Sequence, residues 1–160
     1  MIFSLVFLVS FILFFFPLTA FTAPAAPAPE LESRASKTYK VTVGNNGKLL
    51  YKPQYVYAKP GDWIEFKFHP SNHTATQSTF DHPCIRAFRG WSTGFIPVPK
   101  NQTSHFPSRR FEVPNSDPQW FHCGQTGHCR AGMVFAVNPP KKGNMTFEKY
   151  QKRAMHFGNQ

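Results

Sequence analysis

The sequence predicts an all-β domain, a sandwich or barrel, with one short helix near its C-terminal end. Short segments alternate apolar and polar residues, as TYKVTV (38–43) and WIEFKF (63–68) do. Turn signals such as NNG (45–47) separate these segments, and helical periodicity is almost absent. Short strands separated by turns are typical of sandwiches and barrels.

The remaining elements are predicted from similar local patterns. Residues 49–62 predict short strands broken by Pro53, with a turn at Pro60 and Gly61. Further strands are expected at 109–113, 119–123 and 133–138. The helix is expected at 146–154, where three residues have i, i+3, i+7 spacing behind the N-cap residue Thr146. These three residues are Phe147, Tyr150 and Ala154.

The N-terminal part predicts secretion. Residues 2–16 form an almost unbroken apolar run, shorter than the roughly 18–20 residues of a membrane span. Small residues follow, and a signal peptidase could cut after Ala20 or Ala23. We therefore expect a signal peptide at 1–20, no membrane span and an extracellular, secreted protein. The chain ends without an apolar tail, so we expect no lipid anchor.

Composition separates a predicted linker from the folded domain in the rest of the chain. Alternating Pro and Ala at 23–36 favour extended backbone that cannot form a core, so 21–36 is expected to be a disordered linker. The folded domain is then expected at 37–154, followed by a tail at 155–160.

The formal net charge is +10, which keeps a secreted protein soluble and attracts anionic surfaces. Basic residues are mostly scattered, and secretion removes the chain from nucleic acid, so we expect no nucleic-acid partner. A local cluster near the C-terminus makes an acidic cell-wall or surface polysaccharide a candidate partner. Its members are Lys141, Lys142, Lys149, Lys152 and Arg153.

The segment WFHCGQTGHCRAGMV (120–134) crowds two cysteines, two histidines and a methionine. Three cysteines in a secreted chain leave one that does not pair. It could be buried and unpaired, could join two chains, or could bind a metal. The local pattern favours metal, because a Gly-rich loop after Cys123 can return His128 and Met133 toward its sulfur. Thiolate, imidazole and thioether donors suit copper.

A trigonal copper site needs a second histidine. Segment 69–80 supplies His69 and His73, and we prefer His73, because it lies in the loop beyond the strand; His69 or His82 are the substitutes. Cys84 and Cys129 then remain to form a disulfide. That bridge would close a loop of about 46 residues, worth on the order of 4 kcal/mol.

Three segments resemble the phytocyanin-type cupredoxins, and more so the secreted fungal cupredoxin-domain proteins of the extracellular serine-rich type. They are NHTATQSTFDHPC (72–84), STGFIPV (92–98) and WFHCGQTGHCRAGMVFAVNP (120–139). The resemblance covers about residues 38–154 and implies a Greek-key β-sandwich with one blue-copper centre.

The resemblance also implies roles for single residues. His73 and His128 would be equatorial nitrogen ligands, Cys123 the thiolate and Met133 the weak axial ligand. The family's disulfide matches Cys84 and Cys129. One departure is Thr74, which follows His73 where phytocyanins commonly have Asn.

These features predict a monomeric mononuclear copper protein that transfers electrons to a redox partner protein or binds copper. We expect no enzyme, because the His-x-His pairs of multicopper oxidases and copper-zinc dismutases are absent. Zinc is a weaker interpretation, because Met is a poor zinc ligand. The alternative is a non-enzymatic interaction domain that binds acidic polymers, with metal absent or incidental.

Three Asn-x-Ser/Thr sequons predict glycosylation sites, at Asn72, Asn101 and Asn144. Asn72 adjoins the predicted metal site, so we expect it to be modified least often.

Overall fold

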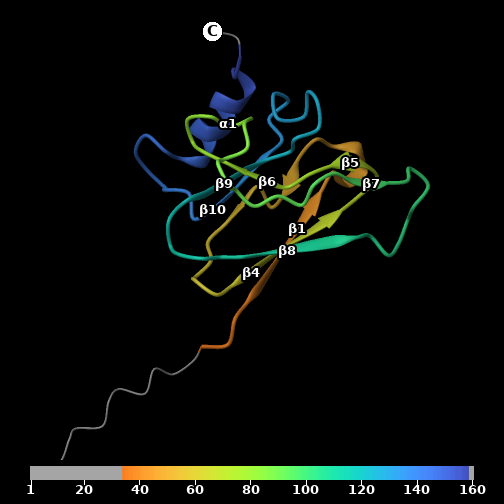
Figure 1. The fold of residues 1–160 in the computed structure, drawn as a ribbon, viewed down its shortest axis with the longest axis horizontal. Helices are drawn as coiled ribbons and strands as arrows, with labels where there is room; N and C mark the ends of the chain where they lie inside the picture. Colours follow the sequence, from red (N-terminus) through yellow and green to blue (C-terminus); the bar gives the residue numbers. More distant parts are fainter. Residues whose placement is uncertain (1–33, 159–160) are drawn as a thin grey trace, which may run out of the picture. The chain divides into compact units, whose positions relative to one another are not determined.

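A computed structural model of the protein describes residues 34–158 (Figure 1). The signal peptide predicted at 1–20 and residues 21–33 of the predicted linker lie outside the described residues, as do residues 159–160 of the predicted tail. Among the residues that are described, no helix is long and apolar enough to cross a bilayer.

One four-stranded sheet has the order β2-β1-β4-β8. Its strands are β1 (Thr38–Val43), β2 (Tyr51–Lys52), β4 (Trp63–Phe68) and β8 (Ser108–Glu112). β1 and β4 run parallel, whereas β8 is antiparallel to β4. The predicted alternation is present, because Val41 and Phe66 are buried while Lys40 and Lys67 are exposed.

The second four-stranded sheet has the order β3-β10-β9-β6. Its strands are β3 (Tyr55–Val56), β6 (Thr76–Ser78), β9 (Gln119–His122) and β10 (Val134–Val137). A separate pair is formed by β5 (Ser71–His73) and β7 (Ile96–Val98), in which His73 lies opposite Ile96. The short 3-10 turn η1 (Asn45–Gly47) joins β1 to β2.

The main core lies between the two sheets. The ring centroid of Phe66 on β4 lies 5.7 Å from that of Phe121 on β9 and 5.3 Å from that of Phe135 on β10. All three side chains are fully buried, and each contributes about 1.5–3 kcal/mol by leaving water. The predicted all-β sandwich is confirmed.

The helix α1 (Phe147–Met155) covers the outer face of the second sheet, beside β9 and β10 (Figure 1). Thr146 caps it, because its side chain accepts a hydrogen bond from the Lys149 N–H. Tyr150 is fully buried, and its ring centroid lies 4.6 Å from that of Trp120 on β9. With both faces of this sheet covered, every residue of β10 is buried.

Asp62 fixes the start of β1. It accepts hydrogen bonds from the backbone N–H groups of Lys37 (2.8 Å) and Lys59 (2.9 Å), and it forms an ion pair with Arg34 at 2.6 Å. Burial alone would raise the pKa of Asp62, but these donors outweigh burial and lower the pKa to about 2. Arg34, at the end of the predicted linker, therefore contacts the domain.

Candidate metal centre

Three donor side chains meet at one end of the sandwich. They come from the end of β5 (His73), the residue after β9 (Cys123) and the following loop (His128), and their donor atoms all lie within 4.8 Å of one another. The Cys123 Sγ lies 3.8 Å from Nδ1 of His73 and 3.5 Å from Nδ1 of His128. The fold thus brings one thiol and two imidazoles to a common point.

Backbone hydrogen bonds shape the loop between β9 and β10. The Cys123 N–H donates to the Met133 carbonyl at 3.1 Å, and the Met133 N–H donates to the His128 carbonyl at 3.0 Å. His128 in turn donates its N–H to the Gln125 carbonyl at 3.0 Å. Met133 is fully buried beside these residues, so the backbone of the hairpin ties all three of its predicted ligands together.

Thr74 holds the cysteine from the side of β5. Its N–H donates to the Cys123 Sγ at 3.4 Å, and its Oγ1 accepts from the Gly124 N–H at 2.7 Å. The same hydroxyl lies 2.9 Å from Oγ1 of Thr76, and the Tyr51 hydroxyl donates to the Thr74 carbonyl at 2.6 Å. Thr74, the departure from the phytocyanin pattern, therefore anchors the cysteine to β5 and β6.

Gly44 lies behind His73, and sequence reasoning missed this role. Its φ is +76°, and a Cβ added there would overlap Nε2 and the ring carbons of the imidazole. The position therefore needs glycine both for its backbone conformation and for the close approach of the ring. The only sequence signal was a Gly before the NNG turn.

Burial sets the protonation of the donors. It lowers the pKa of His73 to about 4, assisted by the nearby His128, and it also lowers the pKa of His128. Burial raises the pKa of the Cys123 thiol, against hydrogen bonds from Thr74 and Gln125 that lower it. Both imidazoles are therefore neutral at neutral pH, the form in which they bind metals, whereas Cys123 must lose its proton to bind one.

The other histidines lie apart from this group. The ring of His69 lies tilted against that of Phe106 with centroids 4.0 Å apart, and His82 is exposed beside Asp81. His122 is buried on the opposite face of β9 from Cys123. Of the three upstream candidates, His73 is the one that the fold brings to Cys123.

A disulfide joins Cys84 to Cys129, the pair that sequence reasoning and the family resemblance both gave. Cys129 follows the donor His128 directly, and Cys84 lies in the segment after β6. The bridge therefore ties the donor loop to that segment. Cys123 is a free, buried thiol.

The three sequons differ in exposure. Asn72 is partly buried, and its Nδ2 donates to Oε1 of Gln125 at 3.1 Å. Asn101 and Asn144 are exposed. Modification at any of the three stays a prediction.

The sandwich and the grouped thiol and imidazoles match what the resemblance to cupredoxins implies. No family model matches the chain. A protein of Arthroderma benhamiae named probable GPI-anchored cupredoxin-1 is 34% identical over 125 residues, 78% of this chain and 63% of the relative. A second from the same organism, named extracellular serine-rich protein, is 32% identical over 124 residues, 75% of this chain and 46% of the relative. The matched segment of this chain is therefore similar to a protein named as a cupredoxin.

The chain thus spans less than two thirds of the length of each of these curated relatives. Similar solved structures include a reduced auracyanin from Roseiflexus castenholzii, with a TM-score of 0.47 and 16% identity over 65% of this chain and 97% of that chain. A mutant plastocyanin of a fern has a TM-score of 0.45 and 16% identity over 62% of this chain and 97% of that chain.

Proposed function

We propose that this protein binds one copper ion through His73, Cys123, His128 and Met133 and transfers single electrons. The observation that carries the proposal is the group of three donor atoms within 4.8 Å of one another. Two imidazoles, a thiolate and a distant thioether form the set typical of blue-copper electron carriers. Copper supplies the one-electron change, and the chain supplies a fixed set of donors.

The surroundings of the donors support electron transfer over catalysis. Thr74, Gly44 and the hairpin hydrogen bonds hold the donors, so a change of charge would need little rearrangement. Four protein donors leave no position for a substrate. His73 is 1% exposed, whereas His128 is only partly buried, so the edge of His128 is the route by which electrons would reach a redox partner protein.

We propose an extracellular location for the same protein. The names of the two curated relatives, GPI-anchored and extracellular, support it. The disulfide supports it as well, because such bonds persist in oxidising compartments. A second candidate role, binding of acidic polymers, is favoured by a cation-lined pocket beside α1.

Visible absorption and EPR of the copper-loaded chain test the proposal. We expect one copper per chain and an intense thiolate-to-Cu(II) absorption that disappears on reduction. Cys123→Ser and His73→Asn should each lose this absorption while the circular dichroism of the sheets is kept. His69→Asn, which changes an upstream histidine outside the donor group, should retain it. A colourless wild type would contradict the assignment. So would a loss of colour in His69→Asn while His73→Asn stays coloured.

A further inference from the structure

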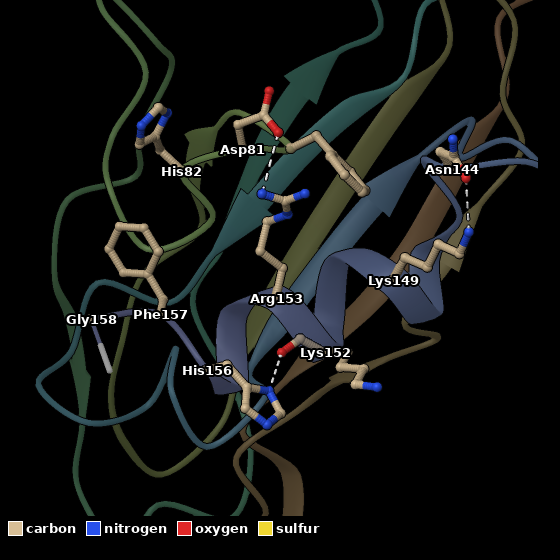
Figure 2. A pocket seen from close by; sticks show the side chains of 10 residues that line it. Asp81, His82, Asn144, Lys149, Lys152, Arg153, His156, Phe157 and Gly158 are labelled. Atoms are coloured by element: carbon tan, nitrogen blue, oxygen red, sulfur yellow. Dashed lines mark hydrogen bonds and ion pairs between the residues drawn. The ribbon is translucent and has the colours of Figure 1, made fainter. Parts of the chain in front are cut away.

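A pocket of about 570 Å³ lies beside α1, and none of the three metal donors lines it (Figure 2). α1 lines one side of it, residues 80–82 line another, and residues 156–158 close one end. Sites for small ligands commonly measure about 300–1,000 Å³. The pocket is therefore large enough to hold part of an oligosaccharide.

The charge of this pocket is positive. Three cations of α1 line it, Lys149, Lys152 and Arg153, against the single carboxylate of Asp81. Asp81 forms an exposed ion pair with Arg153 at 3.4 Å, a contact of small energy that an incoming anion can replace. Lys152 forms no ion pair within residues 34–158. The cluster predicted from sequence is divided, because Lys141 lies over the ring of Tyr57 instead.

Two of the cations are held in place. The Lys149 Nζ donates to the Gly143 carbonyl at 2.9 Å and to Oδ1 of Asn144 at 3.1 Å. The guanidinium of Arg153 lies 5.0 Å from the ring centroid of Phe80. Figure 2 shows Arg153 reaching Asp81 and Lys149 reaching Asn144 from the same helix. Side chains ordered in advance lose less entropy when a ligand binds.

The other lining groups indicate what kind of anion fits. Phe157 is partly exposed at one end of the pocket. His82 and His156 add exposed imidazoles, a group that can donate or accept hydrogen bonds. A sugar acid presents a carboxylate, several hydroxyls and an apolar C–H face, and so matches cations, imidazoles and an aromatic ring together. A small inorganic anion would use the cations alone.

We propose that this pocket binds an acidic oligosaccharide, a chain of uronic acid units. Its carboxylates pair with Lys152 and Arg153, and a sugar ring lies against Phe157. The inference deepens the second candidate role and rests on it, but it does not depend on copper.

A linear tetramer of galacturonic acid is the probe, titrated calorimetrically into the copper-loaded full chain. Lys149→Gln, Lys152→Gln and Arg153→Gln are combined in one pocket variant. The control combines Lys40→Gln, Lys52→Gln and Lys100→Gln, which removes the same charge from exposed positions that do not line the pocket. We expect affinity to fall by about tenfold or more in the pocket variant and by less than about twofold in the control. Equal weakening in both would overturn the proposal.

Further measurements separate the alternatives. Phe157→Ala should weaken binding of the tetramer, and a neutral glucose tetramer should not bind. If inorganic phosphate at an equimolar concentration displaces the tetramer, the pocket is an unspecific anion site and the saccharide assignment is overturned. Backbone resonances of Phe80 and Phe157 should shift in the wild type on titration, and shifts centred on Cys123 instead would overturn it. An unchanged EPR signal in both variants separates this outcome from any failure of the copper site.

Discussion

Thr74 ties β5 to the cysteine through its N–H and its hydroxyl. Thr74→Val keeps the shape but removes the hydroxyl that accepts from the Gly124 N–H, so we expect the free energy of unfolding to fall by about 0.5–1.5 kcal/mol. Thr74→Ser keeps the hydroxyl and should lose much less. Urea denaturation of the three metal-free proteins measures the difference. Equal losses in the valine and serine variants would show that the hydroxyl contributes nothing.

Acid should destabilise the metal-free protein through two buried histidines. Burial lowers the pKa of both His73 and His122 to about 4, against an ordinary value of 6.5. The unfolded chain therefore binds these protons as the pH falls below 6.5, while the folded chain stays neutral until about 4. Within that window, we expect stability to fall by up to about 1.4 kcal/mol per pH unit for each histidine.

Denaturation curves at pH 7, 6 and 5 check this dependence. His122→Gln removes one of these titrating groups, so its stability should depend on pH less steeply than that of the wild type. A stability that is flat between pH 7 and 5 in the wild type would contradict buried neutral histidines.

The sequence predicted the grouping of His73, Cys123 and His128, but not the residues that support them. Cys123, His128 and Met133 share one short loop, so their spacing is visible in the sequence. Gly44 meets His73 only because η1 and β5 come together in the fold. The role of Thr74 likewise depends on the fold bringing it next to Cys123 and Gly124. Contacts of this kind are set by tertiary packing, which no local pattern reveals.

At the scale of elements, one hydroxyl of α1 hydrogen-bonds two strands of the sandwich, β6 and β9. The Tyr150 hydroxyl lies 2.5 Å from Oγ of Ser78 and donates to the Phe121 carbonyl at 3.1 Å. Tyr150→Phe keeps the ring against Trp120 but leaves these partners short of a hydrogen bond, so we expect a loss of about 1–2 kcal/mol. Tyr57→Phe, at an exposed tyrosine, should change stability by less than about 0.5 kcal/mol. Thermal unfolding compares the two, and equal effects would contradict the role of the hydroxyl.

Long alternating segments predicted their strands well, and very short ones did not. β1 and β4 occupy the predicted residues, and α1 lies within one residue of its predicted ends. β5, β6 and β7 have three residues each and were not predicted. Three residues give too little alternation to distinguish a strand from a loop. His73, expected in a loop, is accordingly the last residue of β5.

At the scale of the whole molecule, the Cys84–Cys129 disulfide spans a sequence separation of 45 residues. Replacing both cysteines by Ala removes this constraint on the unfolded chain, so we expect unfolding to become easier by roughly 4 kcal/mol. Because Cys129 adjoins His128, the copper EPR signal should also broaden. Guanidinium denaturation and EPR of the double variant measure the two effects. A stability within 1 kcal/mol of the wild type would contradict this estimate.

The same three cysteines create a sorting problem while the chain oxidises. Cys123 and Cys129 are only six positions apart, so closing that ring costs the unfolded chain about 2 kcal/mol less than closing the native one. A Cys123–Cys129 bond is therefore the favoured early product. It consumes the thiol of Cys123 and also keeps Cys129 from pairing with Cys84. A copper ion that captured the Cys123 thiolate first would remove it from exchange. The supply of metal while the disulfide forms would then govern the yield of correctly paired protein as well as its loading.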